Sequence, residues 1–293
     1  MRPVLWIGGA VLASIAAAGL FLTRAVPVDA AAFDGVTADA ERGESVFIAS
    51  GCASCHAAPD AEGDAKLVLA GGERFPSDFG TFVAPNISMH TEHGIGDWSL
   101  ADFASAVKKG VSPDGGHYYP AFPYTSYAMM TDQDVADLWA YMQTLPADAT
   151  PSEAHDVGFP FNIRRAVGAW KQLYLDPGWV MEDAPTPELE RGRYLVEVLA
   201  HCAECHTPRT ALGGMDESRW MEGAPNPSGR GRIPALTPEE FTWSAVDIAY
   251  YLETGFTPDF DSAGGHMVAV INNFAQLPAS DREAVAAYIK ALP

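Results

Sequence analysis

The N-terminus carries an uncharged, mostly apolar run from Pro3 to Thr23, bounded by Arg2 and Arg24. About 20 apolar residues are enough to span a bilayer as a helix, whereas a cleaved signal sequence has an apolar core of only about 7–15 residues. The length of the run therefore predicts a membrane anchor within residues 1–32. Cleavage near the alanines at 30–32 stays open as an alternative. Under both interpretations the rest of the chain is exported.

Two later stretches show the same helical periodicity. Apolar residues recur at i, i+3, i+4 and i+7 near the end of each half of the chain, and these residues are Leu138, Tyr141, Met142 and Leu145 in the first half and Val285, Tyr288, Ile289 and Leu292 in the second. A capping-box pattern precedes each set, beginning at Thr131 and at Ser280. We therefore expect an amphipathic helix to close each half.

Other motifs repeat in the same order. A Trp-Ser-x-x-Asp helix start occurs at Trp98 and at Trp243, a glycine follows twelve residues after each tryptophan, and both halves then contain Gly-Gly-His. A further helix is expected to begin at Thr186, where Pro187 takes the first helical position. The repetition indicates duplication of one domain.

This duplication predicts domain one at residues 33–148 and domain two at residues 186–293. The connector at 149–185 is punctuated by prolines, and one short helix is expected in it from Ile163 to Leu175. Strand signals are weak throughout the chain. The predicted fold class is therefore mostly α, with long loops.

The formal net charge is −20, from 38 acidic and 18 basic residues. Nucleic acid is a poor partner for such a chain, because phosphate binding needs a basic surface. A protein partner with basic residues around its contact surface fits better, since complementary charge speeds encounter. The alternative is that the acidity only keeps the protein soluble.

All four cysteines lie in two copies of Cys-x-x-Cys-His, at Cys52, Cys55 and His56 and at Cys202, Cys205 and His206. This pattern is the attachment site of c-type haem. Two thiols about one helical turn apart can bond the two vinyl groups of one porphyrin, and the adjoining histidine can bind the iron. We therefore predict two covalently bound haem c groups, with His56 and His206 as iron ligands.

Three alternatives give the cysteines another use. Structural zinc would leave both histidines unexplained, and a redox dithiol usually occurs in a βαβ context that is absent here. Disulfides are common in exported chains, but a two-residue gap makes a cramped bridge. Haem attachment explains all six residues at once.

At this point the chain resembles a known family. Each half is similar to a class I cytochrome c domain, and the whole is similar to membrane-anchored bacterial di- and tri-haem cytochromes, including the cytochrome subunits of periplasmic dehydrogenases. The most specific stretches are residues 94–99, 119–124 and 191–195. The resemblance implies two tandem class I domains after an N-terminal transmembrane helix. It also implies that the first and last helices of each domain cross, with Gly43 against Tyr141 and Gly192 against Tyr288.

The resemblance suggests methionine as the second axial ligand of each haem. In domain two, Met267 lies in a Gly-rich loop at about the distance from the closing helix where class I cytochromes place their ligand. In domain one, relatives with the same 119–124 loop carry methionine at the position of Met130, so Met130 is predicted, with Met129 and His117 as alternatives. Three basic residues of the connector could pair with haem propionates or carry only surface charge: Arg164, Arg165 and Lys171.

The predicted function is electron transfer without catalysis by this chain. A periplasmic dehydrogenase or a quinol-oxidising complex would be the donor, and a cytochrome or terminal oxidase the acceptor. The protein would lie at the inner membrane, with its haem domains in the periplasm. The alternatives are an obligate electron-transfer subunit of a dehydrogenase complex and a di-haem peroxidase, in which one iron lacks a fixed sixth ligand.

Overall fold

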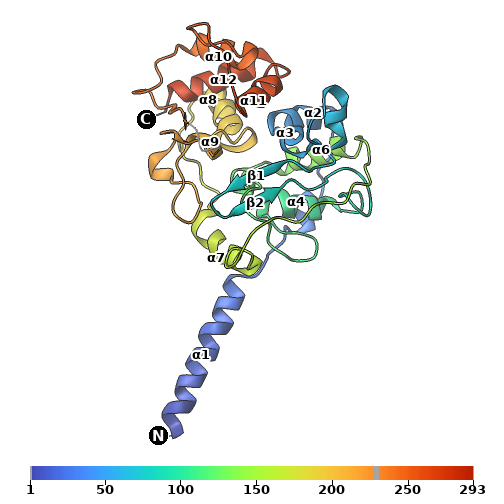
Figure 1. Ribbon diagram of the computed structural model, residues 1–293, viewed down its shortest axis with the longest axis vertical. Helices are drawn as coiled ribbons and strands as arrows, with labels where there is room; N and C mark the ends of the chain where they lie inside the picture. The colour runs from blue at the N-terminus through green and yellow to red at the C-terminus, as the bar shows by residue number, and fades with distance from the viewer. Residues whose placement is uncertain (1, 228–230, 293) are drawn as a thin grey trace.

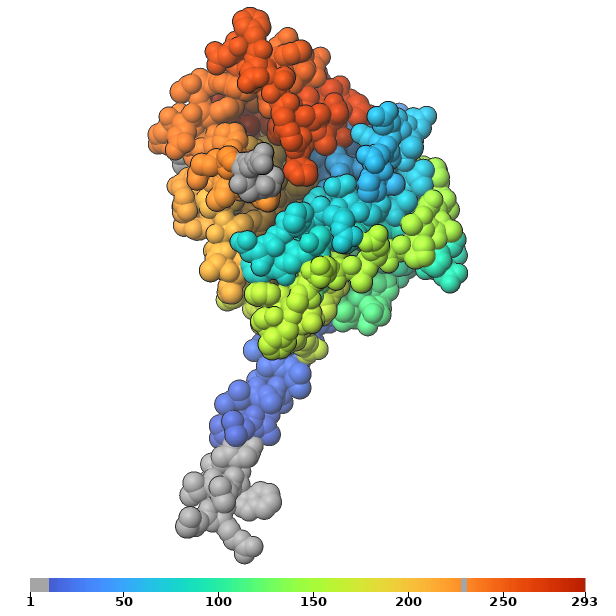
Figure 2. Space-filling view, viewed as in Figure 1, coloured from blue at the N-terminus to red at the C-terminus, as the bar shows by residue number. Residues whose placement is uncertain are grey.

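The computed structural model describes residues 2–227 and 231–292. Two helical units pack side by side into one body, and helix α1 projects away from it (Figure 1). In the space-filling view the segment around residues 267–274 lies against the region around residues 50–65 of the first unit (Figure 2). The mostly helical fold class is confirmed, and the exact domain boundaries stay predictions.

The elements run in the same order in both units. The N-terminal part and first unit contain α1 (Arg2–Leu22), η1 (Ala30–Phe33), α2 (Ala40–Ala49), α3 (Cys52–His56), η2 (Gly63–Val68), β1 (Arg74–Ser77), β2 (Gly80–Val83), α4 (Leu100–Lys109), α5 (Tyr124–Tyr127) and α6 (Asp132–Met142). The connector and second unit contain α7 (Arg164–Tyr174), α8 (Pro187–Arg193), η3 (Tyr194–Leu199), α9 (Ala203–His206), η4 (Glu217–Arg219), β3 (Ala224–Pro225), β4 (Arg232–Ile233), α10 (Ala245–Thr254), α11 (Met267–Phe274) and α12 (Ala279–Lys290).

Several predicted helix starts are confirmed, because the signals that set them are local. Ser99 and Ser244 each form a complete capping box, with Asp102 and Asp247 as the third helical residues. Both helices end at a glycine in the left-handed conformation, at Gly110 (φ 58°) and Gly255 (φ 77°). The predicted helix of the connector is present as α7, between Ile163 and Leu175.

Two expectations need correction, and a third finds no support. Helix α12 begins at Ala279 after Pro278 and has no side-chain cap, so the capping box predicted at Ser280 is wrong. Two short antiparallel hairpins, β1–β2 and β3–β4, were missed because strands of two to four residues carry little periodicity. Among the helices of residues 2–227 and 231–292, none is long and apolar enough to cross a membrane, so the predicted membrane-spanning helix has no support there.

The first and last helices of each unit cross at a glycine, as expected. A Cβ atom on Gly43 would lie 1.9 Å from the carbonyl oxygen of Asp137 and 2.9 Å from the Cβ of Tyr141. At Gly192 the same distances are 2.0 Å to the carbonyl oxygen of Ala284 and 3.0 Å to the Cβ of Tyr288. Because any side chain would force the helices apart, both crossings require glycine.

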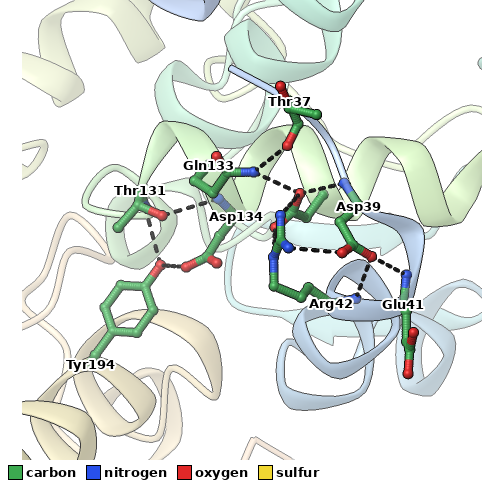
Figure 3. A network of polar contacts seen from close by, with 9 residues as sticks. Thr37, Asp39, Glu41, Arg42, Thr131, Gln133, Asp134 and Tyr194 are labelled. Atoms are coloured by element: carbon green, nitrogen blue, oxygen red, sulfur yellow. Dashed lines mark hydrogen bonds and ion pairs between the residues drawn. The ribbon is translucent and has the colours of Figure 1, made fainter. Parts of the chain in front are cut away.

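A polar network ties the first unit together at its crossing (Figure 3). The buried Asp137 carboxylate accepts bonds from Arg42 Nε (2.9 Å), Asp39 N (2.7 Å) and Gln133 Nε2 (2.8 Å). Burial alone would raise the pKa of Asp137, but these bonds outweigh it and lower the pKa. The carboxylate is therefore charged in the folded protein at neutral pH.

Tyr194 of the second unit reaches into the start of α6 in the first unit (Figure 3). Its hydroxyl donates to the carboxylate of Asp134 and accepts from the backbone N–H of Thr131 at 3.1 Å. Thr131 directly follows Met130. The contact between the units therefore positions the chain next to the predicted sixth ligand of domain one.

Candidate haem sites

Each Cys-x-x-Cys-His motif forms one turn of helix. The first is α3, and the second is α9 together with its N-terminal neighbour Cys202. Because the two cysteines are three residues apart in a helical turn, their side chains lie on one side of it. The geometry suits bonding of both thiols to one planar group.

The residue before each motif is left-handed. Gly51 has φ 65°, which glycine adopts freely, whereas its counterpart His201 has φ 41°. The His201 ring packs edge-on against Tyr127 of the first unit, with ring centroids 5.5 Å apart. The second motif therefore depends on a contact with the first unit to hold its entry turn.

Both motif histidines are oriented by a proline carbonyl. His56 Nδ1 lies 2.9 Å from Pro85 O, and His206 Nδ1 lies 2.8 Å from Pro234 O. A carbonyl oxygen only accepts, so Nδ1 is the protonated nitrogen and Nε2 keeps its lone pair for a metal. Burial lowers the pKa of both histidines, which favours this neutral form.

The two hairpins place these prolines. Strand β2 ends at Val83, two residues before Pro85, and β4 ends at Ile233, directly before Pro234. The backbone adds a second tie, from Gly71 N to His56 O (2.8 Å) and from Gly223 N to His206 O (2.7 Å). Sequence reasoning missed both prolines. The available signal was their repeated spacing, 29 and 28 residues after the motif histidines.

The four thiols are free of disulfide bonds. Burial raises the pKa of Cys52 to about 12 and that of Cys202 to about 12, so both thiols are protonated at neutral pH. Within the described ranges, no group of three or more His, Cys, Asp and Glu side chains is arranged to hold a metal ion. The donor set thus fits covalent haem attachment better than a zinc site or a disulfide.

The predicted sixth ligands differ in burial. Met130 is almost fully buried in the core of the first unit, with 1% of its surface exposed, while Met129 is half-buried beside it. Met267 is the first residue of α11 and is half-buried. Both methionine assignments stay predictions.

The alternative ligand His117 is engaged elsewhere. Its Nε2 lies 3.0 Å from Thr23 O, and its Nδ1 lies 3.2 Å from Lys171 Nζ. With both ring nitrogens in hydrogen bonds, His117 has no free lone pair to bind iron. The structure therefore disfavours it as a ligand and gives it a role in holding the end of the N-terminal helix.

The connector's basic residues also bind protein groups. Lys171 is buried and donates to Lys109 O (2.5 Å) and Gly110 O (2.8 Å), which are backbone carbonyls at the end of α4. Arg165 donates to Thr23 Oγ1 at 2.9 Å, and the Arg164 guanidinium stacks on the Tyr119 ring. Lys171 and Arg165 thus have protein partners, and the suggested pairing with haem propionates stays a prediction.

Each attachment motif is hydrogen-bonded to the other unit. Ser54 in the first motif accepts a bond from Asn273 Nδ2 of α11 at 3.1 Å. Glu204, at the same position of the second motif, accepts from Thr125 Oγ1 of α5 at 2.9 Å and pairs with Arg209. The two motifs therefore lie at the contact between the units and face it in the same way.

The fold and both sites define a c-type cytochrome with two haem groups. The cytochrome c family profile matches residues 40–146. A diheme cytochrome c-type protein of Cereibacter sphaeroides is 58% identical over 100% of this chain and 99% of its own length. The chain therefore belongs to the cytochrome c family and carries two covalently bound haem c groups.

Two other relatives are subunits of larger assemblies. The fructose dehydrogenase cytochrome subunit of Gluconobacter japonicus is 36% identical over 92% of this chain and 56% of its own length. The cytochrome c subunit of a quinone-type alcohol dehydrogenase of Gluconobacter oxydans is 33% identical over 86% of this chain and 54% of its own length. The chain thus spans little more than half the length of these two subunits.

Proposed function

We propose that this protein relays single electrons between its two haem groups, taking them from a dehydrogenase or quinol-oxidising complex and passing them to a cytochrome or terminal oxidase. The observation that carries the proposal is the pair of reciprocal bonds, Ser54 to Asn273 and Glu204 to Thr125. These bonds hold both attachment motifs at one contact between the units. Electron exchange is favoured when the two redox groups are held close together in a rigid, water-poor surrounding.

A buried methionine in the first unit argues against the peroxidase alternative. Peroxide chemistry needs an open iron site, whereas Met130, the predicted sixth ligand, is buried in the core of the first unit. An electron relay instead needs a haem iron in each unit whose sixth coordination position is occupied by a protein ligand.

The experiment measures electron exchange within one molecule. The purified holoprotein is half-reduced by a fast photoreductant, and equilibration between the haems is followed by absorbance. Replacement of Asn273 by leucine removes the bond to Ser54 and adds an apolar group at the contact, and we expect exchange to slow at least about tenfold, which corresponds to about 1.4 kcal/mol. The matched control is Gln276→Leu, because the Gln276 side chain bonds only to its own segment at Asn272 O (2.8 Å). Wild-type haems that do not equilibrate within the molecule would refute the relay.

The partner is proposed from the relatives. Two of them are named as cytochrome subunits of a fructose dehydrogenase and of a quinone-type alcohol dehydrogenase. We expect the native protein to co-purify with a dehydrogenase or quinol-oxidising subunit in stoichiometric amount. Isolation as a free carrier with full activity toward an acceptor would instead make it an independent cytochrome.

We place the protein at the inner membrane, with both haem domains in the periplasm. The support is the uncharged run from Pro3 to Thr23 and the projection of α1 from the body (Figure 1). After cell fractionation and a carbonate wash, the full chain should sediment with membranes, and a chain without residues 2–24 should be released. Equal release of both chains would contradict the anchor.

A further inference from the structure

The outer side of the second unit carries an uncovered apolar surface, which we call the α10 surface. It is formed by one turn of α10 and the loop that follows it, with Val246 77% exposed, Tyr250 54%, Phe256 50% and Phe260 93%. The three aromatic side chains of this set line a groove of about 440 Å³ together with Asp247, Thr257 and Pro258. Contiguous exposed apolar groups of this kind mark interaction sites.

The same surface of the first unit is covered by the chain itself. Aligned through the Trp-Ser-x-x-Asp and glycine repeat, Ser105 corresponds to Tyr250 and Val111 to Phe256. Ser105 is only 4% exposed and Val111 only 3%. The N-terminal segment lies over this part of α4, where Val28 N donates to Ser105 Oγ at 2.9 Å.

The connector completes this cover in the first unit. Lys171 of α7 binds both carbonyls at the end of α4. No described segment lies in this way over the end of α10, where Tyr250 and Phe256 stay half-exposed. One fold thus has the same surface occupied in one copy and free in the other.

The charges around the α10 surface indicate its occupant. Residues 244–263 contain no Lys, Arg or His and four acidic residues, which are Asp247, Glu253, Asp259 and Asp261. Asp259 and Asp261 are exposed on either side of Phe260. Arg282 is paired with Glu253 at 3.4 Å and leaves the rest of the rim acidic. A matching surface would have an apolar centre with lysines and arginines around it.

Phe260 adds a local observation. This bulky residue has φ 63°, in the left-handed region that aromatic residues rarely adopt, and yet its ring is almost fully exposed. Packing within the chain therefore gives no reason for it. An exposed aromatic held in a strained turn is a typical anchor for a partner.

The α10 surface is also close along the chain to the predicted axial ligand of the second haem. The loop that carries Phe256 and Phe260 runs within a few residues into Met267, the predicted axial ligand. A Cβ on Gly255, at the start of that loop, would lie 3.7 Å from Ile271 of α11. The surface lies at the end of the body opposite α1, where a separate protein can approach (Figure 1).

We infer that the α10 surface docks a separate redox protein whose contact surface is apolar in the centre and rimmed by lysines and arginines, and that this partner exchanges electrons with the second haem. The inference rests on the proposed relay, since it names the partner's chemistry and the unit that meets it. Docking by apolar contact with a charged rim gives fast, salt-dependent association.

The test uses the full-length holoprotein and a basic mitochondrial cytochrome c as the probe. Electron transfer between the two proteins is followed by stopped flow at rising ionic strength. We expect the second-order rate to fall steeply with salt in the wild type. Phe260→Ser should lower it at least about fivefold at low salt, and Asp259→Asn with Asp261→Asn should remove most of the salt dependence.

Matched controls come from elsewhere on the chain. Leu173→Ser changes a 65%-exposed apolar residue of α7, and Glu188→Gln with Glu190→Gln removes two exposed charges from α8. Both controls should behave as the wild type.

Failure of this inference is distinct from failure of the relay. Exchange between the two haems is measured on the same samples after photoreduction. If exchange between the haems is normal and the α10 variants transfer electrons to the probe as fast as the wild type does, the docking inference is overturned and the relay stands. A wild type that reacts with the basic probe without salt dependence, or fails to react with it, also overturns the docking inference.

Discussion

The two units share one scaffold but differ in how their outer surfaces are covered. In the first unit the N-terminal segment and α7 bury Ser105 and Val111, and Met130 is sealed in the core. In the second unit the equivalent Tyr250 and Phe256 stay exposed, and Met267 is only half-buried. The difference teaches that one copy is closed by its own chain, while the other is left accessible to another protein. The four predictions below test how far this contrast goes.

The largest effect is expected at the helix crossings, where the units are most alike. Gly43→Ala and Gly192→Ala would each place a Cβ about 2 Å from a backbone oxygen that cannot move without separating the helices. Each change should destabilise its unit by about 3 kcal/mol. Thermal unfolding of the holoprotein, followed by haem absorbance, measures it.

The control for this prediction is Gly158→Ala, because nothing lies within 4 Å of a Cβ at Gly158. If one of the two variants lost less than about 0.5 kcal/mol of unfolding free energy, the two crossings would not be equivalent.

The next effect concerns the axial ligands, where the units differ in burial. Met130→Leu and Met267→Leu keep the side-chain volume but remove the sulfur, so each should abolish the long-wavelength Met–iron absorption of one haem. Each should also lower that haem's reduction potential by on the order of 0.1 V. An optical redox titration measures both, and Met129→Leu is the control. A Met130→Leu protein with two unchanged centres would remove Met130 from the ligand set.

A smaller effect is expected at Asp137, which binds Arg42 at the first crossing, whereas Arg191 at the second crossing pairs with Asp281. Asp137→Asn weakens bonds from Arg42 and Gln133 and should cost about 1–2 kcal/mol at pH 7. Because the folded pKa is lowered, the stabilisation is present above the unfolded value near 4 and is lost as pH falls through the folded pKa. Urea unfolding at pH 7 and near pH 3 should therefore show a smaller acid loss in the variant. An unchanged acid loss would mean that other carboxylates cause it.

The smallest effect is expected at Lys171, which covers the end of α4. Burial, followed by the nearby Arg164 and Lys109, lowers the pKa of Lys171 to about 7. The folded state thus holds this proton less tightly than the unfolded chain, so stability should rise from about pH 7 toward the unfolded value near 10.4 and stay flat below pH 7. Lys171→Met should reduce this rise, as measured by unfolding at pH 7 and pH 9. An identical rise in both proteins would contradict the assignment.

The sequence predicted what local signals determine. The helix starts at Ser99 and Ser244 follow from a short motif, whereas the helix crossings at Gly43 and Gly192 were implied by the resemblance to class I cytochromes c. Contacts between distant segments were missed. Pro85 and Pro234 act through carbonyls that any residue possesses, so their role depends on the hairpins that place them.

The same dependence on tertiary contacts applies to the charged groups. Lys171 and His117 carry chemistry that suits a haem site, but the fold brings them to each other and to the end of α4. The sequence pattern of the capping box at Ser280 was present, but α12 begins at Ala279, two residues before the start that this cap predicts. The residue types identified the candidate side chains, but the tertiary contacts of each side chain determine which groups it binds.

The left-handed His201 has a consequence for how such chains can diverge after duplication. Its conformation costs about 1 kcal/mol more than that of the glycine at position 51, and Tyr127 of the other copy supports it. The second unit therefore depends on the first unit and should be less stable when it is separated from it. If the second unit were fused to another protein, His201 would keep its strained conformation but would lose its contact with Tyr127.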